Sequence, residues 1–430
     1  MRTFLVHNFG CRAAQADGAA LEGMLRRKGL EAVGSNAEAD LVILNTCTVT
    51  AAADEDVRQA VRRAHRENPQ ARILITGCYA QRAPQELIEL PGVAWVVGNS
   101  HKTEIAEVVA TETPYHGQIL VGEISRQREF AAGWVEEAAS DRSRPNLKIQ
   151  DGCGNRCSFC IIPAVRGPSR SAKPEEVIEQ VRVLATKYQE IVLTGINLGR
   201  WGRDLGGRMR LADLLRRLLA ETDVRRLRLS SVEPMDWSDD LLALMASEKR
   251  IAKHVHAPLQ SGSDSVLRRM RRRYRPRHYE DRMRKAREWM PDAAIGADVM
   301  VGFPGETEAE FEESRQFLAS LPFTYLHVFT YSERPGTEAL QLPDPVPWAL
   351  RKERNKILRD LGESKNLAFR RLMVGKTLSA VTLDPPGLAL TENYLKVQLS
   401  QPRAANQIVD VTIGGVTPTG LCEQTPFRLL

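Results

Sequence analysis

The sequence lacks the features that mark membrane proteins, secreted proteins and histidine-rich metal enzymes. It contains no apolar run of about 18 residues, so no bilayer-spanning helix is predicted. Its first residues, MRTFLVHNFGCRAAQ, have no long apolar core followed by a cleavage site, so no signal peptide is predicted. Its eight histidines are scattered, none has the helical spacing H-E-x-x-H, and we assign them no role. We therefore expect a cytoplasmic protein without a membrane partner.

Cysteine is also scarce, with seven residues in a chain of 430. Without a signal peptide, these cysteines indicate metal or redox chemistry rather than disulfides. Three of them, Cys153, Cys157 and Cys160, stand close together in the run DGCGNRCSFCIIPAVRG. Structural zinc sites usually close with four ligands, whereas a [4Fe–4S] cluster on three thiolates keeps one iron open. The spacing therefore favours an iron–sulfur cluster, with a zinc loop completed by a distant Cys or His as the alternative.

Three further cysteines follow predicted strands in the first 112 residues. Apolar runs at 3–10, 39–47, 71–78 and 95–99 alternate with helical patterns at 15–28, 51–68, 84–89 and 102–110. This alternation predicts a parallel sheet, in which ligands bind at the carboxyl ends of the strands. The first three runs end at Cys11, Cys47 and Cys78. We predict that these thiols converge on a second metal site; the alternative is three unrelated core cysteines.

The remainder of the chain predicts a barrel followed by a small β domain. Residues 113–145 are irregular and indicate a linker. Six strands are expected between residues 146 and 340, in NLKIQ, EIVLTG, RRLRLSS, HVHAPLQ, IGADVMVG and YLHVFTY, which fits an open (βα)6 barrel with its chemistry at the strand ends. A basic helix over 351–371 leads into short strands divided by Gly, Pro and Asn, which predict a small OB-like barrel of a kind that often binds nucleic acid. Cys422 stands alone there, and we interpret it as a structural thiol.

Positive charge is concentrated in one segment. The chain carries a net charge of +6, yet residues 268–287 alone hold eleven Lys or Arg and two acidic residues. Such a concentration favours a polyanion-binding surface. The alternative is a solvated helical face without a partner.

Two cysteine trios and a C-terminal β-barrel resemble the radical S-adenosylmethionine (SAM) methylthiotransferases. The resemblance covers nearly the whole chain, and the blocks DGCGNRCSFCIIP, HAPLQSGSDSVLRRM, DVMVGFPGETEAEF and HVFTYSERPGT are close to the family's blocks. It implies an α/β protein with a methylthiotransferase N-terminal domain (1–112), a linker (113–145), a radical SAM partial TIM barrel (146–370) and a TRAM domain (371–430). One departure stands in GCRAAQADG, where Ala14 and Gly18 replace the family's usual Asn and hydroxyl residue.

The segments NTCTVT and GCYAQ are similar to those of the enzymes that act on N6-threonylcarbamoyladenosine at position 37 of tRNA, the MtaB type. The implied reaction adds a methylthio group to C2 of that base and uses two SAM molecules and a sulfur donor. The alternatives are the same chemistry on N6-isopentenyladenosine-37 of tRNA or on an aspartate of ribosomal protein S12. A non-enzymatic alternative is an RNA-binding iron–sulfur sensor or a zinc-bound scaffold.

The resemblance also implies the cofactors, the partners and the roles of the cysteines. One [4Fe–4S] cluster on Cys153, Cys157 and Cys160 would bind and cleave SAM, and an auxiliary cluster on Cys11, Cys47 and Cys78 would hold the sulfur that is transferred. The partners are a tRNA anticodon loop, an electron donor such as flavodoxin or ferredoxin, and a sulfur donor. The predicted SAM contacts are Phe159, Glu233, Gln260, Gly302 and Gly305, and the predicted RNA contacts are Arg271, Arg272, Arg273 and Tyr394.

Overall fold

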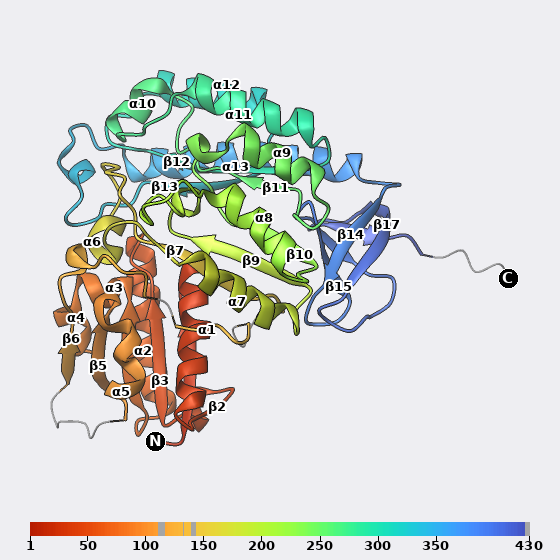
Figure 1. Ribbon diagram of the computed structural model, residues 1–430. Coiled ribbons are helices and arrows are strands. Elements are labelled where there is room, and N and C mark those ends of the chain that lie inside the picture. The colour runs from red at the N-terminus through yellow and green to blue at the C-terminus, as the bar shows by residue number, and fades with distance from the viewer. Residues whose placement is uncertain (111–116, 132, 139–142, 426–430) are drawn as a thin grey trace.

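The first part of the chain folds into a parallel sheet with helices on both faces (Figure 1). The computed structural model describes residues 1–110, 117–131, 133–138 and 143–425. The sheet has the order β2-β1-β3-β4-β5-β6, and its central strand β3 is buried along its whole length, as its sequence LVILNT requires. The strands are β1 Thr3–Asn8, β2 Glu31–Ala32, β3 Leu41–Thr46, β4 Arg72–Gly77, β5 Val93–Gly98 and β6 Gln118–Leu120. The helices are α1 Arg12–Arg27, α2 Ala51–Glu67, α3 Cys78–Arg82, α4 Pro84–Ile88 and α5 Ile105–Val108.

Two separate apolar layers hold this sheet. On one face, Leu21 and Leu25 of α1 pack with Ile105 of α5, Phe4 and Trp95. On the other face, side chains of α2, α3 and α4 form a second cluster against the sheet. Strand β6 belongs to the segment predicted as a linker and adds to the edge of the sheet beside β5. Residues 113–116, 132 and 139–142 of that predicted linker lie outside the described residues.

The second part is an open half-barrel, as predicted. Its strands form two hydrogen-bonded sheets of order β10-β9-β7-β8 and β11-β12-β13, joined by a parallel bridge between Leu227 and Ile251. The six expected strands all form, and the short antiparallel β8 is added to them. The strands are β7 Asn146–Asp151, β8 Arg170–Ser171, β9 Glu190–Gly195, β10 Arg226–Leu229, β11 His254–His256, β12 Ala294–Val301 and β13 Tyr325–Thr330. The helices are α6 Ile162–Arg166, α7 Pro174–Ala185, α8 Leu211–Glu221, α9 Asp239–Ser247, α10 Asp264–Arg269, α11 Pro276–Trp289 and α12 Glu308–Ser320.

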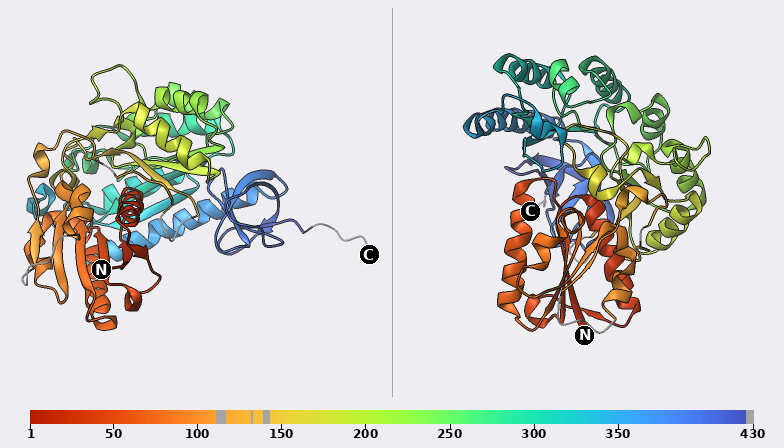
Figure 2. Two further views of the ribbon diagram at one scale, coloured as in Figure 1. Left: turned by 60° about the horizontal axis from the view of Figure 1, so that its bottom comes forward. Right: turned by 90° about the vertical axis from the view of Figure 1, so that its left-hand side faces the viewer.

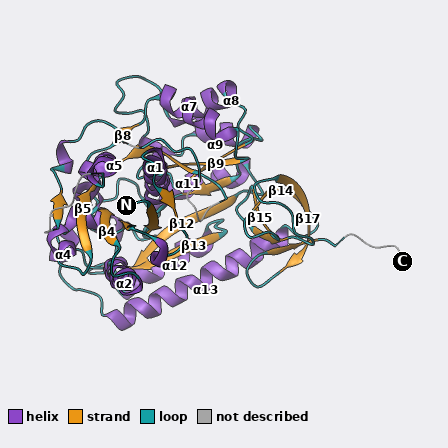
Figure 3. Cartoon of the chain, turned by 90° about the horizontal axis from the view of Figure 1, so that it is seen from below, coloured by secondary structure: helices purple, strands orange, loops and turns teal. Residues whose placement is uncertain are grey.

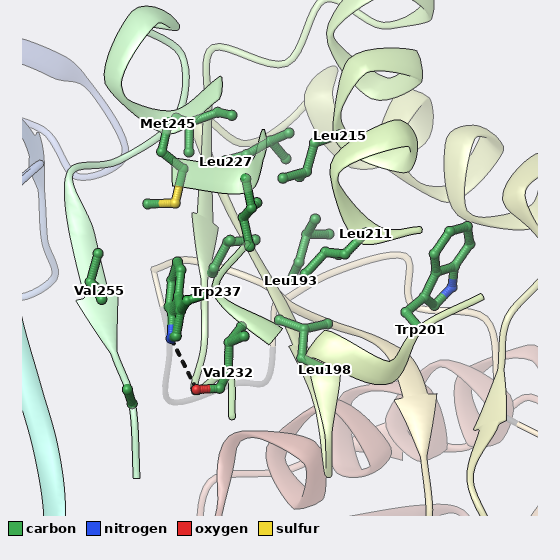
Figure 4. Close-up of a cluster of buried hydrophobic side chains, with 14 of the residues drawn as sticks. Leu193, Leu198, Trp201, Leu211, Leu215, Leu227, Val232, Trp237, Met245 and Val255 are labelled. Carbon is green, nitrogen blue, oxygen red and sulfur yellow. Dashed lines mark hydrogen bonds between the residues drawn. The ribbon is translucent and has the colours of Figure 1, made fainter. Parts of the chain in front are cut away.

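The largest apolar core lies between the half-barrel and its outer helices. Figure 4 shows part of it, where Leu193 of β9 and Leu227 of β10 face Leu211 and Leu215 of α8. The indole of Trp237 is buried there and donates to the Val232 carbonyl (3.0 Å). Side chains alternate along each strand, so this packing leaves the other face of the strands to line the barrel interior.

Helix α13, Trp348–Leu372, runs beside β13 and leads into the C-terminal barrel (Figure 3). This barrel closes in the order β14-β15-β16-β18-β17. Its strands are β14 Thr377–Thr382, β15 Leu388–Thr391, β16 Lys396–Gln398, β17 Ile408–Val416 and β18 Leu421–Glu423. Short 3-10 turns complete the described structure: η1 Asn36–Glu38, η2 Asn99–Glu104, η3 Ile124–Arg126, η4 Leu198–Arg200, η5 Pro234–Asp236 and η6 Glu338–Gln341.

The three parts meet at the open side of the half-barrel. Helix α1 packs against β7 and β9, and Figure 2 shows the N-terminal part lying below the half-barrel with its strand ends turned toward it. The C-terminal barrel sits at the starts of the barrel strands, where Ala294 of β12 shares an apolar cluster with Phe369 of α13 and Leu378 of β14. In the described part of the chain, no helix has both the length and the apolar character needed to cross a bilayer.

Candidate functional site

The first cysteine trio lies at three adjacent strand ends. Cys11 directly precedes α1, Cys47 follows β3, and Cys78 follows β4 as the first residue of α3. Because β1, β3 and β4 are neighbours in the sheet, the three thiols face one region. Burial raises the pKa of Cys47 to about 12, and the nearby thiolates of Cys78 and Cys11 add to this rise. Gly10 leaves the space that this arrangement needs, since a Cβ there would lie 3.0 Å from the Cys47 Sγ.

The second trio lies on the loop that follows β7. The Cys153 amide donates to the Gly167 carbonyl (3.0 Å), and the Cys160 amide donates to the Cys157 carbonyl (3.1 Å), so the loop wraps on itself. The Asn155 amide donates to the Cys153 Sγ (3.4 Å). Burial raises the pKa of Cys160 to about 12, and the charges of Cys157 and Cys153 raise it further. The three thiols therefore interact as one group.

The spacing within each trio tests which group the thiols fit. All six cysteines are free. Three sulfurs on one zinc ion would lie within roughly 4 Å of one another, given Zn–S bonds of about 2.3 Å. Among the described residues, only His256, Asp298 and His327 bring three candidate ligand atoms within 4.8 Å of one another, so both cysteine trios are spaced more widely. Wider spacing fits a [4Fe–4S] cluster, in which each thiolate binds a different iron.

The two trios are in contact through one buried segment. Cys78 packs against Ile161 and Val165, which follow directly after the second trio. Arg166, at the end of α6, donates from Nε to the Cys78 Sγ (3.2 Å) and from Nη1 to Asp151 (3.0 Å). The segment after Cys160 thus reaches the first trio and joins the two trios through direct contacts with Cys78.

A buried ionic network fixes this junction. Asp17 of α1 accepts from Arg166 (3.0 Å) and Lys102 (3.0 Å) and also pairs with Lys148 of β7, which in turn binds Asp151 (2.6 Å). Burial alone would raise the pKa of Asp17, but the charges of the three cations hold it well below its usual range. Three cations face two carboxylates here, and Arg166 also donates to the Cys78 Sγ.

Replacing Asp17 by Asn is expected to destabilise this junction by about 3 kcal/mol or more, because Lys102 would lose its described carboxylate partner and Lys148 and Arg166 would keep only Asp151. The measurement is thermal unfolding of the cluster-loaded protein followed by circular dichroism. Asp360→Asn is the matched control, since Asp360 forms only an exposed pair with Lys356 (3.1 Å). Equal unfolding temperatures for the two variants would contradict the assigned role of the network.

At Ala14 and Gly18, where the sequence departs from the family, the side chains of Asn8 and Asn45 lie against helix α1. A Cβ at position 18 would lie 1.8 Å from the Asn8 Oδ1, so the Asn8 side chain fills the space that a larger residue would take. Asn45 donates to the Asn8 Oδ1 (3.0 Å) and to the Ala14 carbonyl (2.6 Å). The Asn45 amide of β3, which also binds Asn8 of β1, thus supports the start of α1, which carries Cys11 at its N-cap.

The predicted SAM contacts have protein partners, and two of them, Phe159 and Glu233, are close to the second trio in the chain or through Arg272. Phe159 packs edge-on against Phe303 with ring centroids 6.4 Å apart, and Glu233 pairs with Arg272. Gln260 adopts φ 69° and bridges to β12 at Val299. The glycines at 302 and 305 have φ of 72° and 73°. A Cβ at position 302 would lie 2.3 Å from Arg351, so protein packing already accounts for that glycine.

The three consecutive arginines have different surroundings. Arg271 and Arg273 are exposed; Arg271 pairs with Glu338 (2.5 Å), and Arg273 lines a cavity of about 230 Å³ beside Gly154 of the cysteine loop. Arg272 is buried and donates to the Cys157 Sγ (3.1 Å). Its guanidinium therefore faces a predicted cluster ligand and is closed to a polyanion at the surface.

The last predicted RNA contact, Tyr394, also faces inward. Its ring stacks on His254 with centroids 4.2 Å apart, and its hydroxyl accepts from Arg12 (2.9 Å). The tyrosine joins the C-terminal barrel to the start of α1 and to the barrel interior, away from the outer surface of its own domain.

Sequence reasoning missed a polar group inside the half-barrel. Asp298 of β12 lies 3.4 Å from the His256 Nε2 and 3.2 Å from the His327 Nδ1. Ser231 lies 2.6 Å from the other ring nitrogen of His256. The period-two pattern of HVH in β11 is the signal that was available, because it puts His254 and His256 on one face of the strand.

Comparisons with known proteins agree with this architecture. Residues 3–98 match the Uncharacterized protein family UPF0004, and residues 147–318 match the Radical SAM superfamily. The radical S-adenosylmethionine methyltransferase TsrM from Kitasatospora setae, with cobalamin and a [4Fe-4S] cluster bound, superposes with a TM-score of 0.57 at 17% identity, over 79% of this chain and 77% of that one. At that identity the match supports the fold alone.

Sequence relatives carry the comparison further. The chain is 39% identical to the threonylcarbamoyladenosine tRNA methylthiotransferase MtaB of Aquifex aeolicus, over 94% of this chain and 98% of that protein. It is 40% identical to the MtaB of Bacillus subtilis, over 92% and 90%. The tRNA-2-methylthio-N(6)-dimethylallyladenosine synthase of Saccharopolyspora erythraea is 33% identical, over 91% and 81%. Such relatives imply SAM and [4Fe–4S] clusters as cofactors, and the chain belongs to the radical SAM methylthiotransferase family.

Proposed function

We propose that this protein adds a methylthio group to C2 of N6-threonylcarbamoyladenosine at position 37 of tRNA, using two SAM molecules and a sulfur donor. The observation that carries the proposal is the contact of Cys78 with Ile161 and Arg166, which connects the first cysteine trio to the segment directly after the second. When bound there, the clusters would supply one-electron cleavage of SAM and a place to hold the transferred sulfur. We assign Cys153, Cys157 and Cys160 to the first task and Cys11, Cys47 and Cys78 to the second.

The protein's own residues position these groups and the base. Asp54, which accepts from Thr48 (2.5 Å) and from Arg334 (2.9 Å), fixes the Cys47 loop against the chain that follows β13. Val49 of that loop and Phe329 of β13 are both large exposed apolar residues. We propose that they hold the extruded base, because unpaired RNA bases are bound by stacking on apolar and aromatic side chains.

The division of the chain and its partners complete the proposal. We place a methylthiotransferase domain at 1–112, a linker at 113–145, a radical SAM domain at 146–370 and a TRAM domain at 371–430. The reaction needs an electron donor such as flavodoxin or ferredoxin, and it takes place on tRNA in the cytoplasm. The MtaB proteins of Aquifex aeolicus and Bacillus subtilis favour threonylcarbamoyladenosine over isopentenyladenosine, because they are 39% and 40% identical against 33% for the dimethylallyladenosine enzyme of Saccharopolyspora erythraea.

Nucleoside mass spectrometry of bulk tRNA tests the proposal. A strain that lacks the gene should accumulate N6-threonylcarbamoyladenosine without its 2-methylthio form, and the intact gene should restore that form. Loss of 2-methylthio-isopentenyladenosine instead would assign the enzyme to the other tRNA substrate. Unchanged tRNA together with an unmodified S12 aspartate would assign it to the ribosomal protein.

RNA binding can be tested separately from SAM cleavage, because Arg271 and Arg273 are exposed whereas Arg272 is buried against Cys157. Arg271→Ala with Arg273→Ala should weaken tRNA binding and reduce its salt dependence by roughly 1.5 in the log–log slope, because up to two phosphate contacts are lost. Cleavage of SAM without tRNA should stay intact, since neither side chain contacts a cysteine sulfur in the described structure. Arg272→Ala is the contrasting variant and should impair SAM cleavage. Unchanged affinity and an unchanged salt slope in the double variant would show that this segment is a solvated helical face without a partner.

A further inference from the structure

A cavity of about 430 Å³ lies where the three parts of the chain meet. Helix α1 contributes Arg12 and Gln15, the segment entering β7 contributes Arg144 and Asn146, and the C-terminal barrel contributes Tyr394 and Lys396. Each of these six side chains carries a polar or charged group, and each part of the chain supplies two of them. The cavity therefore has its full lining only when the three parts are docked.

The cavity has an excess of positive charge. Arg12 donates to the Tyr394 hydroxyl (2.9 Å), and no carboxylate of the described residues lies within 4.0 Å of its guanidinium. Arg144 binds Glu190 (2.5 Å), but that buried carboxylate is also the partner of Arg226 and Arg228. Asp384 is the one acidic residue in the lining, against Arg12, Arg144 and Lys396. An anionic ligand would supply the missing partner.

Tyr394 is held in place by its neighbours at this site. Its backbone adopts φ 65°, a region that costs a non-glycine residue energy and that marks residues positioned by their surroundings. Its ring is fixed by stacking on His254, whose Nε2 lies 2.7 Å from the Tyr325 hydroxyl. Burial alone would raise the pKa of Tyr394, but the charges of Arg12, Arg144 and Arg228 lower it below its usual value. The same positive field would stabilise a bound anion.

The position of Arg12 relates this cavity to the reaction. Arg12 directly follows Cys11, so their Cα atoms are about 3.8 Å apart. A base whose C2 faces the first cysteine trio would carry its N6 substituent within a few ångströms of C2. In the threonylcarbamoyl group that substituent ends in a carboxylate, whereas an isopentenyl group has no charge. Arg12 follows Cys11 in the chain and carries its guanidinium into the cavity at Tyr394, so its charge matches the feature that separates the two candidate tRNA substrates.

We propose that Arg12, supported by Tyr394 and Arg144, binds the carboxylate of the N6-threonylcarbamoyl group and so selects the substrate base. This inference rests on the function proposed above. Charge-assisted pairing of arginine with a carboxylate is among the strongest hydrogen-bonded contacts in proteins. A site built for that contact also rejects an apolar substituent, because the desolvated guanidinium would be left without a partner.

The test compares binding of two tRNAs that differ only at position 37. The cluster-loaded protein is titrated with one tRNA carrying threonylcarbamoyladenosine and with the same tRNA carrying unmodified adenosine. We expect the native protein to prefer the modified tRNA at least tenfold. Arg12→Gln should reduce that preference to less than threefold while affinity for the unmodified tRNA stays within twofold, and Arg12→Lys should restore part of the preference.

Two further variants separate the carboxylate role from a structural one. Tyr394→Phe removes only the hydroxyl that accepts from Arg12. If Arg12→Gln lowers the unfolding temperature, the tRNA preference of Tyr394→Phe is measured in its place, and we expect it to be reduced. Arg225→Gln is the matched control, since Arg225 is an exposed arginine that lines a different cavity. It should leave the preference unchanged.

Three results would overturn the assignment. In the first, the preference persists in both Arg12→Gln and Tyr394→Phe. In the second, these variants lose affinity for both tRNAs in equal proportion, which would assign the cavity to a backbone phosphate. The native protein could also show no preference while still methylthiolating threonylcarbamoyladenosine, which would sink this inference and leave the proposed function standing. Absence of that product in the native protein is the separate failure of the proposed function.

Discussion

Replacing Cys153, Cys157 and Cys160 together by alanine is expected to abolish reductive SAM cleavage and to lower the iron content from about eight to about four atoms per chain. These thiols occupy one loop after β7, burial together with the charges of Cys157 and Cys153 raises the pKa of Cys160, and their spacing exceeds that of a mononuclear zinc site. The cysteines of the first trio lie on separate strand ends of another sheet, so their cluster should still assemble. The measurements are iron analysis after anaerobic reconstitution and chromatography of 5′-deoxyadenosine.

Cys422→Ala is the matched control for this variant. Cys422 lies in β18 of the C-terminal barrel and belongs to neither trio, so its loss should change neither iron content nor SAM cleavage. Recovery of zinc in place of iron in the native protein would overturn the cluster assignment. Retained SAM cleavage in the triple variant would overturn the assignment of this trio to SAM.

The architecture was predictable because its signals are local. Runs such as EIVLTG and YLHVFTY are short, apolar and rich in β-branched or aromatic residues, and they form β9 and β13 at the expected places. The convergence of Cys11, Cys47 and Cys78 was also predictable, because each directly follows a strand and the carboxyl ends of neighbouring parallel strands lie at one edge of the sheet. The short strand β6 was not predicted, because its three residues in a polar segment carry no periodic pattern.

The contacts between the parts of the chain were not predictable in the same way. Arg12 and Tyr394 are 382 residues apart, and neither stands in a pattern that indicates the other. Arg272 lies in the most basic segment, yet a net charge says nothing about which guanidinium turns inward to Cys157. Arg166 ends the run IIPAVRG without any visible signal of its contact with Cys78. Such contacts depend on how domains dock, and one sequence does not record that docking.

Replacing Cys11, Cys47 and Cys78 by alanine is expected to preserve 5′-deoxyadenosine production and to abolish formation of the 2-methylthio nucleoside. The cysteines that we assign to SAM cleavage are all on the loop after β7 and remain intact in this variant. The altered thiols are those assigned to the transferred sulfur, so the carbon–sulfur bond should not form. The readouts are 5′-deoxyadenosine by chromatography, nucleosides of the added tRNA by mass spectrometry, and about four irons per chain.

Arg166 makes this prediction sensitive to the choice of substitution. It is buried, donates to the Cys78 Sγ and holds Asp151, which directly precedes the loop of the second trio. Cys78→Ala leaves its guanidinium without that acceptor, whereas Cys11→Ala changes an exposed cysteine that accepts none of the hydrogen bonds described for Arg166. The single Cys11 variant should therefore lose methylthio transfer with SAM cleavage at its native rate. Normal yield of the methylthio product in the triple variant would show that this trio does not carry the sulfur. Loss of 5′-deoxyadenosine in the triple variant but not in Cys11→Ala would instead place the coupling between the two trios at Arg166.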